Sequence, residues 1–250
     1  LSILSAGTFA NVLTAIFFLG VLWIFFTTCF SASGVVFDAY SYSPVEISSI
    51  VAVNGIAIEN PNYEKIMNLL NGKKFDKIET DEKNYLATRE ILEGQTDEEN
   101  YLILYDDAPA INAELVGAIS EINGVEIKSL ESLKNELEKY SIGEEVLIET
   151  KTSEGIKEFE IVLEKNPRED RAWLGIGFSS QESSGILGKM YSTLASFKKA
   201  HIYYEPNWIG GIFIYDLLWW IILISISVAL VNMLPIGMFD GGRVFYLTIL

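Results

Sequence analysis

The stretch NMLPIGMFDGG, Asn232–Gly242, decides how the C-terminal part of the chain folds. It closes the apolar run Gly211–Leu234, which as a helix is long enough to cross the roughly 30 Å hydrocarbon core of a bilayer. Pro235 then removes a helical N–H, and Asp240 places a carboxylate where insertion costs ~2.5–3.5 kcal/mol. Two interpretations are open. Either the span ends and a loop follows, or a broken helix holds Asp240 at membrane depth, which requires surrounding protein or a wet cavity.

A second apolar run, Phe9–Phe30, predicts another membrane-spanning helix, because it is too long for a signal peptide and no basic segment precedes it. Half of the 250 residues are hydrophobic, yet the formal net charge is −16. All acids except Asp216 and Asp240, and all bases except Arg243, lie between residues 38 and 205. The composition therefore predicts an integral membrane protein in which two spans flank an acidic module. That module lacks the basic surface of a nucleic-acid-binding protein.

Asp216 is a second carboxylate in the C-terminal span. Trp219 and Trp220 lie close to it, as in the aromatic belts of membrane interfaces, so we expect an interfacial acid. A pair of catalytic aspartates must share a proton at about 3 Å. On one helix Asp216 and Asp240 would be about 36 Å apart, at ~1.5 Å per residue. An aspartyl protease is therefore excluded.

The acidic module is predicted to be rich in strands with short helices. Glu145–Thr152 and Glu158–Glu164 alternate apolar and polar residues around a turn at Ser153–Gly155, which indicates two paired strands. Ser129–Tyr140 has leucines at helical spacing behind a Ser cap. Phe75–Asn100 is acidic with few apolar positions, and we expect an exposed excursion outside the core.

A short internal similarity joins two parts of the module. IVAVNGIAIEN (Ile50–Asn60) and AISEINGVEIKS (Ala118–Ser129) each contain an apolar strand, Asn-Gly and a second short strand. Asn-Gly favours a type I′ turn in any hairpin. An internal repeat and two unrelated hairpins therefore both remain open on this pattern alone.

The surroundings of the second copy resemble a PDZ domain of the kind found in membrane proteases. Asp106–Thr152 has the Pro-Ala, the INGxxI hairpin, the helix and the two paired strands, although the usual Gly-Asp before a strand is missing. The resemblance implies a groove that takes an extended peptide by strand addition. We therefore expect five segments: a transmembrane core helix (1–33), a β-rich part that is either a degenerate PDZ-like unit or an insertion (34–105), a PDZ-like domain (106–180), a linker with an amphipathic segment (181–206) and a second transmembrane core helix (207–250).

Asn232–Arg243 resembles the N-x-x-P-x-x-x-x-D-G-G motif of the site-2 protease family of intramembrane zinc metalloproteases. The resemblance implies that Asp240 is a zinc ligand and that Asn232 holds the substrate strand or polarises its carbonyl. Pro235, Gly241 and Gly242 complete the motif.

The first span carries a second match to the same family. Ser5–Asn11 is similar to the A-G-P-x-x-N segment, with Gly7 and Asn11 in place and Thr8 where the family has Pro. The resemblance implies a mixed fold: a polytopic α-helical membrane core with an inserted α+β PDZ-like module. It also implies a multi-pass protein whose module lies outside the cytoplasm.

Zinc catalysis needs three protein ligands and an open position for water, and HExxH supplies two His ligands and a general base. The sequence contains no HExxH, and its single His, His201, has no partner at i+4. We expect the other Zn²⁺ ligands upstream of Leu1 and expect the printed segment to be inactive by itself. The predicted function is regulated intramembrane proteolysis, with a transmembrane protein substrate, an extended peptide in the groove and the lipid bilayer as partners. The alternative is a membrane-anchored PDZ-like adaptor or an inactive protease relative.

Overall fold

The computed structural model describes residues 2–95, 100–167, 169–179, 185, 197–234, 236, 239 and 241–242. The chain divides into two compact units. The helical unit comprises Leu1–Ser33, Glu182–Ala200 and Tyr204–Leu250, and the module unit comprises Gly34–Gln181 with His201–Tyr203.

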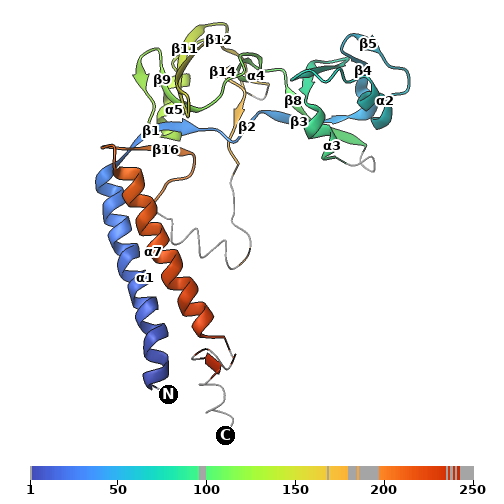
Figure 1. Cartoon of the computed structure of the whole chain (residues 1–250). Coiled ribbons are helices and arrows are strands. Elements are labelled where there is room, and N and C mark those ends of the chain that lie inside the picture. The colour runs from blue at the N-terminus through green and yellow to red at the C-terminus, as the bar shows by residue number, and fades with distance from the viewer. Residues whose placement is uncertain are drawn as a thin grey trace. The chain divides into compact units, whose positions relative to one another are not determined.

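The described part of the helical unit contains two long helices, α1 (Ser2–Cys29) and α7 (Gly211–Asn232). They lie side by side in Figure 1. At 1.5 Å per residue they are about 42 Å and 33 Å long, which matches or exceeds a bilayer core. Within them, Gly7–Cys29 and Gly211–Asn232 have mean hydropathies of 2.3 and 2.2, so both are apolar enough to cross a membrane. The two apolar runs predicted from the sequence are confirmed as helices.

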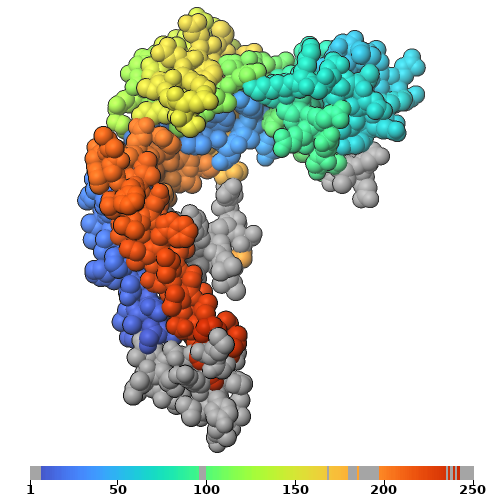
Figure 2. Space-filling view, in the orientation of Figure 1, coloured from blue at the N-terminus to red at the C-terminus, as the bar shows by residue number. Residues whose placement is uncertain are grey.

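A narrow seam joins the two helices. Ala15 and Leu22 of α1 and Leu218 and Ile222 of α7 form its buried centre. The outward faces are apolar as well: Phe17 and Phe213, for example, are 65% and 70% exposed. The surface of α7 that Figure 2 shows in orange runs along the helix without a charged side chain after Asp216. Apolar faces of this extent are consistent with helices that contact lipid.

Aromatic side chains gather at the end of the seam that contains the C-terminus of α1. Phe26 contacts Tyr204 at 4.9 Å and Tyr215 at 5.9 Å between ring centroids. The ammonium of Lys198 lies 4.3 Å from the Tyr215 ring and 5.2 Å from the Phe26 ring. Such amphipathic clusters occur where a helix passes from hydrocarbon to water.

The module unit has two lobes, each with its own core. The first lobe, residues 41–106, is a six-stranded sheet in the order β3-β8-β7-β6-β4-β5. Its strands are β3 (Tyr42–Glu46), β4 (Ile50–Val53), β5 (Ile56–Ala57), β6 (Asp76–Thr80), β7 (Asn84–Ala87) and β8 (Tyr101–Asp106); its helices are η1 (Ile47–Ser49), α2 (Tyr63–Asn68) and α3 (Arg89–Glu93).

The second lobe comprises residues 107–179 together with the strands that flank the module. Its main sheet has the order β12-β11-β9-β1-β16, with β10 on β9, and two short strand pairs, β13-β14 and β15-β2, complete it. The elements are β1 (Phe30–Val36), β2 (Ala39–Tyr40), α4 (Pro109–Asn112), β9 (Ala118–Ile122), β10 (Val125–Glu126), α5 (Leu130–Leu137), β11 (Glu145–Thr152), β12 (Gly155–Val162), β13 (Glu164–Lys165), β14 (Ala172–Trp173), β15 (Ile176–Gly177) and β16 (Ile202–Pro206).

The two lobes repeat one hydrogen-bonding pattern around their Asn-Gly turns. Asn54 exchanges bonds with Lys77: its N–H donates to the Lys77 carbonyl (2.8 Å), and its Oδ1 accepts from the Lys77 N–H (3.0 Å). Asn123 does the same with Leu147, at 2.8 Å for both bonds. Both turns have positive φ at Asn and Gly, as type I′ requires. The order β4-β5-α2-β6-β7 thus has the same connectivity as β9-β10-α5-β11-β12.

Several predicted elements are confirmed, and one prediction is wrong. β11 has the predicted bounds, and α5 begins directly after its cap, Ser129, whose hydroxyl accepts from Ser132. β12 begins earlier than expected, at Gly155. Phe75–Asn100 is not an exposed excursion: it supplies β6, β7 and α3, and Ile78 and Leu92 have no exposed surface. Each of these elements contributes only one or two side chains to the core. The acidic composition of the segment therefore gave no clear signal of buried strands or of a helix.

Candidate functional site

The chain reverses at the C-terminal end of α7. Asn232, the predicted substrate-positioning residue, is the last residue of the helix and is half-buried. The Phe239 N–H donates to the Ile236 carbonyl at 2.9 Å. A Cβ added to Gly241 would lie 2.3 Å from the carbonyl oxygen of Met233. The helix ends two residues before Leu234, the predicted end of the apolar run. Gly241 packs against the last helical turn more closely than any side chain allows.

The structure describes some of the other predicted site residues and not others. Asp240 and Pro235 lie outside the described residues. Gly7 and Asn11 lie within the first turns of α1, where Gly7 is exposed and Asn11 is half-buried. Gly242 is buried. The role predicted for each of these residues stays a prediction.

The described residues do not fit a zinc site. Among them, no three His, Cys, Asp or Glu side chains come together as metal ligands. The single His, His201, lies in the module unit with its Nδ1 3.4 Å from Asp38 Oδ2. Hydrogen bonds from the Ser179 backbone N–H (2.7 Å) and hydroxyl (2.8 Å) hold the pKa of Asp38 below its ordinary value, and the adjacent His201 adds to this shift. His201 thus pairs with Asp38 and is largely buried.

A groove in the second lobe is a candidate binding site. It has a volume of about 350 Å³ and lies between α5 and the segment Ala172–Phe178. Leu130, Leu133 and Leu137 line the helical side, with Lys134 and Glu138 beside them. An apolar floor with charges at its rim suits an extended peptide whose apolar side chains point inward.

The backbone of β15 faces this groove. The carbonyls of Gly175 and Gly177 accept from Ser41 and Asp38 on the β2 side, at 2.8 and 3.1 Å. Because antiparallel strands alternate, the N–H and C=O of Ile176 point away from β2. The groove therefore combines apolar side chains with a strand edge. Sequence reasoning missed Leu174–Phe178, although two glycines alternating with apolar residues marked a strand where backbones approach closely.

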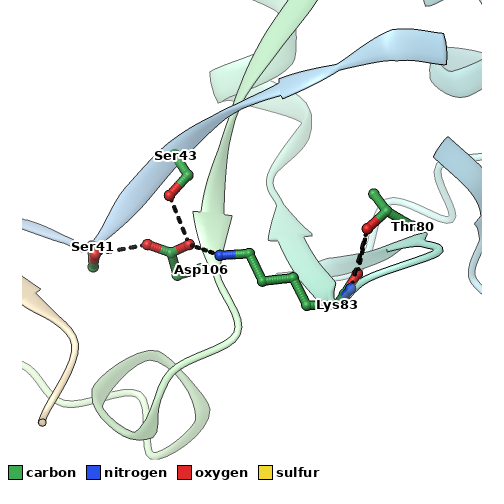
Figure 3. Close-up of polar contacts among 5 residues, drawn as sticks. All are labelled: Ser41, Ser43, Thr80, Lys83 and Asp106. Atoms are coloured by element: carbon green, nitrogen blue, oxygen red, sulfur yellow. Dashed lines mark hydrogen bonds and ion pairs between the residues drawn. The ribbon is translucent and has the colours of Figure 1, made fainter. Parts of the chain in front are cut away.

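A polar network in the first lobe is structural. The buried carboxylate of Asp106 accepts from Ser41 (2.7 Å), Ser43 (2.9 Å) and the ammonium of Lys83 (3.0 Å), as Figure 3 shows. Although burial acts to lower it, the hydrogen bond and charge of Asp106 leave the pKa of Lys83 raised. The network lines a cavity of about 640 Å³. Each oxygen of Asp106 has a donor, so the carboxylate joins β8 to β3 and to Lys83, the residue before β7, and its role is structural.

Two packed apolar helices of membrane-spanning length, with a two-lobed α+β module between them, are consistent with a membrane protein that presents a peptide-sized groove. A profile described as peptidase family M50 matches residues 1–250, the whole printed sequence. The chain therefore belongs to peptidase family M50, the site-2 protease family. Membership implies protease activity in general, and zinc dependence is typical of the family. A comparison with curated proteins gave no match.

Proposed function

We propose that this chain forms part of an intramembrane zinc metalloprotease of site-2 type that cleaves transmembrane substrates. The observation that carries the proposal is the family match over residues 1–250, together with the N-x-x-P-x-x-x-x-D-G-G motif at the end of α7. Helical substrates must unfold locally before a peptide bond becomes accessible. The end of a helix, where the backbone reverses, is a suitable place to receive such a segment.

In this proposal Asp240 supplies one Zn²⁺ ligand, and Asn232 positions the substrate backbone. A bound zinc would lower the pKa of its water toward ~7 and so supply a nucleophile at neutral pH. The described residues contain no complete ligand set.

The module is proposed to bind an extended peptide in the groove between α5 and β15, and so to select which substrates reach the membrane site. Strand addition on Ile176 gives affinity for any backbone, and the leucines of α5 give a preference for apolar side chains. By resemblance to the family, the module lies outside the cytoplasm. The second lobe is proposed to be a PDZ-like domain, and the first lobe a degenerate PDZ-like unit related to it. The repeated pattern at Asn54 and Asn123 supports this relation between the lobes.

A second candidate function is a membrane-anchored peptide-binding adaptor. It is favoured by the groove of the second lobe, because a peptide-binding groove is the one site that an adaptor requires. The test is incubation of the full-length protein with a single-pass substrate in liposomes. The protease produces a cut in the apolar span, whereas the adaptor binds the substrate and leaves it intact.

Replacing Leu130 with Asp should weaken peptide binding by about tenfold or more, because it places a charge in the apolar groove. Leu130 is the first residue of α5 and is 36% exposed, and an acid at a helix N-terminus is favourable, so the fold should tolerate the change. Fluorescence anisotropy with a labelled extended peptide measures the effect. Glu131→Ala, on the next and exposed residue, is the matched control and should bind as the wild type does. Equal affinity of Leu130→Asp and the wild type would contradict the role of the groove.

A further inference from the structure

The two lobes share their topology but differ at the strand edge that faces the helix. In each lobe, the strand that follows the repeated hairpin pairs with a strand that precedes the repeat: β15 with β2, and β8 with β3. The corresponding helices are α5 and α2. The space between α5 and β15 is the open groove of about 350 Å³. In the first lobe, β7 pairs with β8 at Tyr105 and Asp106, so the uncovered part of the β8 edge begins at Ile103. The segment between β7 and β8 forms α3.

Helix α3 packs against α2 in the first lobe. The Tyr63 hydroxyl of α2 donates to the Leu92 carbonyl of α3 at 2.9 Å. The Leu92 side chain has no exposed surface and belongs to the same buried cluster as Ile66 of α2 and Leu104 of β8. Leu92 thus packs with α2 and β8 in the core of the first lobe.

Gln95, two residues beyond α3, completes the closure. Its carboxamide nitrogen donates to the Ile103 carbonyl (3.0 Å), and its oxygen accepts from the Ile103 N–H (2.7 Å). The register of β8 places Ile103 opposite Pro44, and the bonded positions of the pair are Leu102 and Leu104. Ile103 therefore directs both backbone groups away from β3, as Ile176 directs its groups away from β2. One side chain reproduces the two hydrogen bonds that an added peptide strand would make.

We infer that the first lobe is closed by its own α3–Gln95 segment and that the module binds one extended peptide, on the Ile176 edge of the second lobe. The first lobe supplies the occupant of its own edge, so it acts as a structural partner and not as a second receptor. The bonds of Gln95 to Ile103 also show what the peptide offers Ile176: one carbonyl and one N–H from a single residue. The binding of a peptide at Ile176 rests on the proposed function of the groove.

The test is site-resolved amide hydrogen exchange of the full chain in lipid nanodiscs. In Gln95→Ala, the Ile103 amide should exchange about tenfold faster, because its acceptor is lost. The matched variant Gln95→Glu keeps an acceptor oxygen and should keep that amide slow. The amides of Leu102 and Leu104, which face β3, should stay slow in both variants and so exclude unfolding of the lobe. Unchanged exchange at Ile103 in Gln95→Ala would overturn the closure.

The same measurement with a peptide tests the stoichiometry. The probe is acetyl-Thr-Val-Thr-Val-Thr-Val-Thr-amide, which forms an extended strand and has no charged end. It should slow the Ile176 amide and leave Ile103 unchanged in the wild type. Slowing at Ile103 would overturn the inference. A probe that slows neither amide would contradict the proposed peptide groove of the second lobe, while the Gln95→Ala result would still decide whether the first lobe is closed.

Discussion

Replacement of Asp240 by Asn should abolish cleavage of a membrane substrate by the full-length protein. Asn has nearly the same shape but lacks the negative charge that a zinc ligand supplies. Even partners in the outer shell of a metal contribute about 10–100-fold to affinity or activity, so the loss of a direct ligand should exceed about 100-fold. The measurement is the rate of product formation in liposomes, together with zinc per protein by elemental analysis.

Asp216→Asn is the matched control, because Asp216 is the other acid of the C-terminal span. It lies on the second turn of α7 and is exposed. This variant should retain wild-type cleavage and zinc content. If Asp240→Asn retained both as well, Asp240 would not be a ligand.

Gly241→Ala should lower cleavage by about 100-fold. The added Cβ would lie 2.3 Å from the Met233 carbonyl oxygen, and the contact is with backbone that cannot rotate away. The reversal after α7 would have to open, and a displacement of about 1 Å at a reacting centre costs roughly 100-fold in rate. The same assay in liposomes measures this effect.

Gly20→Ala provides the comparison for that variant. Gly20 lies in α1, and a Cβ there would meet no atom within 4 Å. Its cleavage rate should equal that of the wild type. Equal rates for Gly241→Ala and Gly20→Ala would mean that the close approach at Met233 does not shape the site.

The membrane helices and part of the module follow from the sequence because their signals are local. The apolar runs at Phe9–Phe30 and Gly211–Leu234 correspond to helices ending at Cys29 and Asn232. The alternation in Glu145–Thr152 depends on one buried face, so it gives the bounds of β11 directly. The Ser129 cap likewise fixes the start of α5.

The first lobe could not be predicted in the same way. β6 has a buried carboxylate, Asp76, that accepts from Asn54 (2.9 Å) and the Asn71 N–H (2.9 Å), so part of its inner face is polar. The relation of the first lobe to the second lobe is clearest in the hydrogen bonds of Asn54 and Asn123. A pattern of hydropathy does not reveal such bonds. The Asn-Gly turns alone are consistent both with an internal repeat and with two unrelated hairpins.

Part of the candidate site could be predicted from the sequence, and part could not. Asn232 and the glycine reversal follow a motif of fixed spacing, and the structure places α7's end there. The groove depends on Ile176 meeting α5 across about forty residues of sequence, which requires the tertiary fold. The closure of the first lobe by Gln95 depends on a side chain that imitates a strand, and its sequence signal is a single polar residue.

The most direct test of the protease assignment is the position of the cut in a single-pass substrate, determined by mass spectrometry of both products from liposomes. The account predicts a cut inside the apolar span that disappears when a chelator removes zinc and returns when zinc is restored. A cut outside the span, or one that persists without zinc, would contradict it.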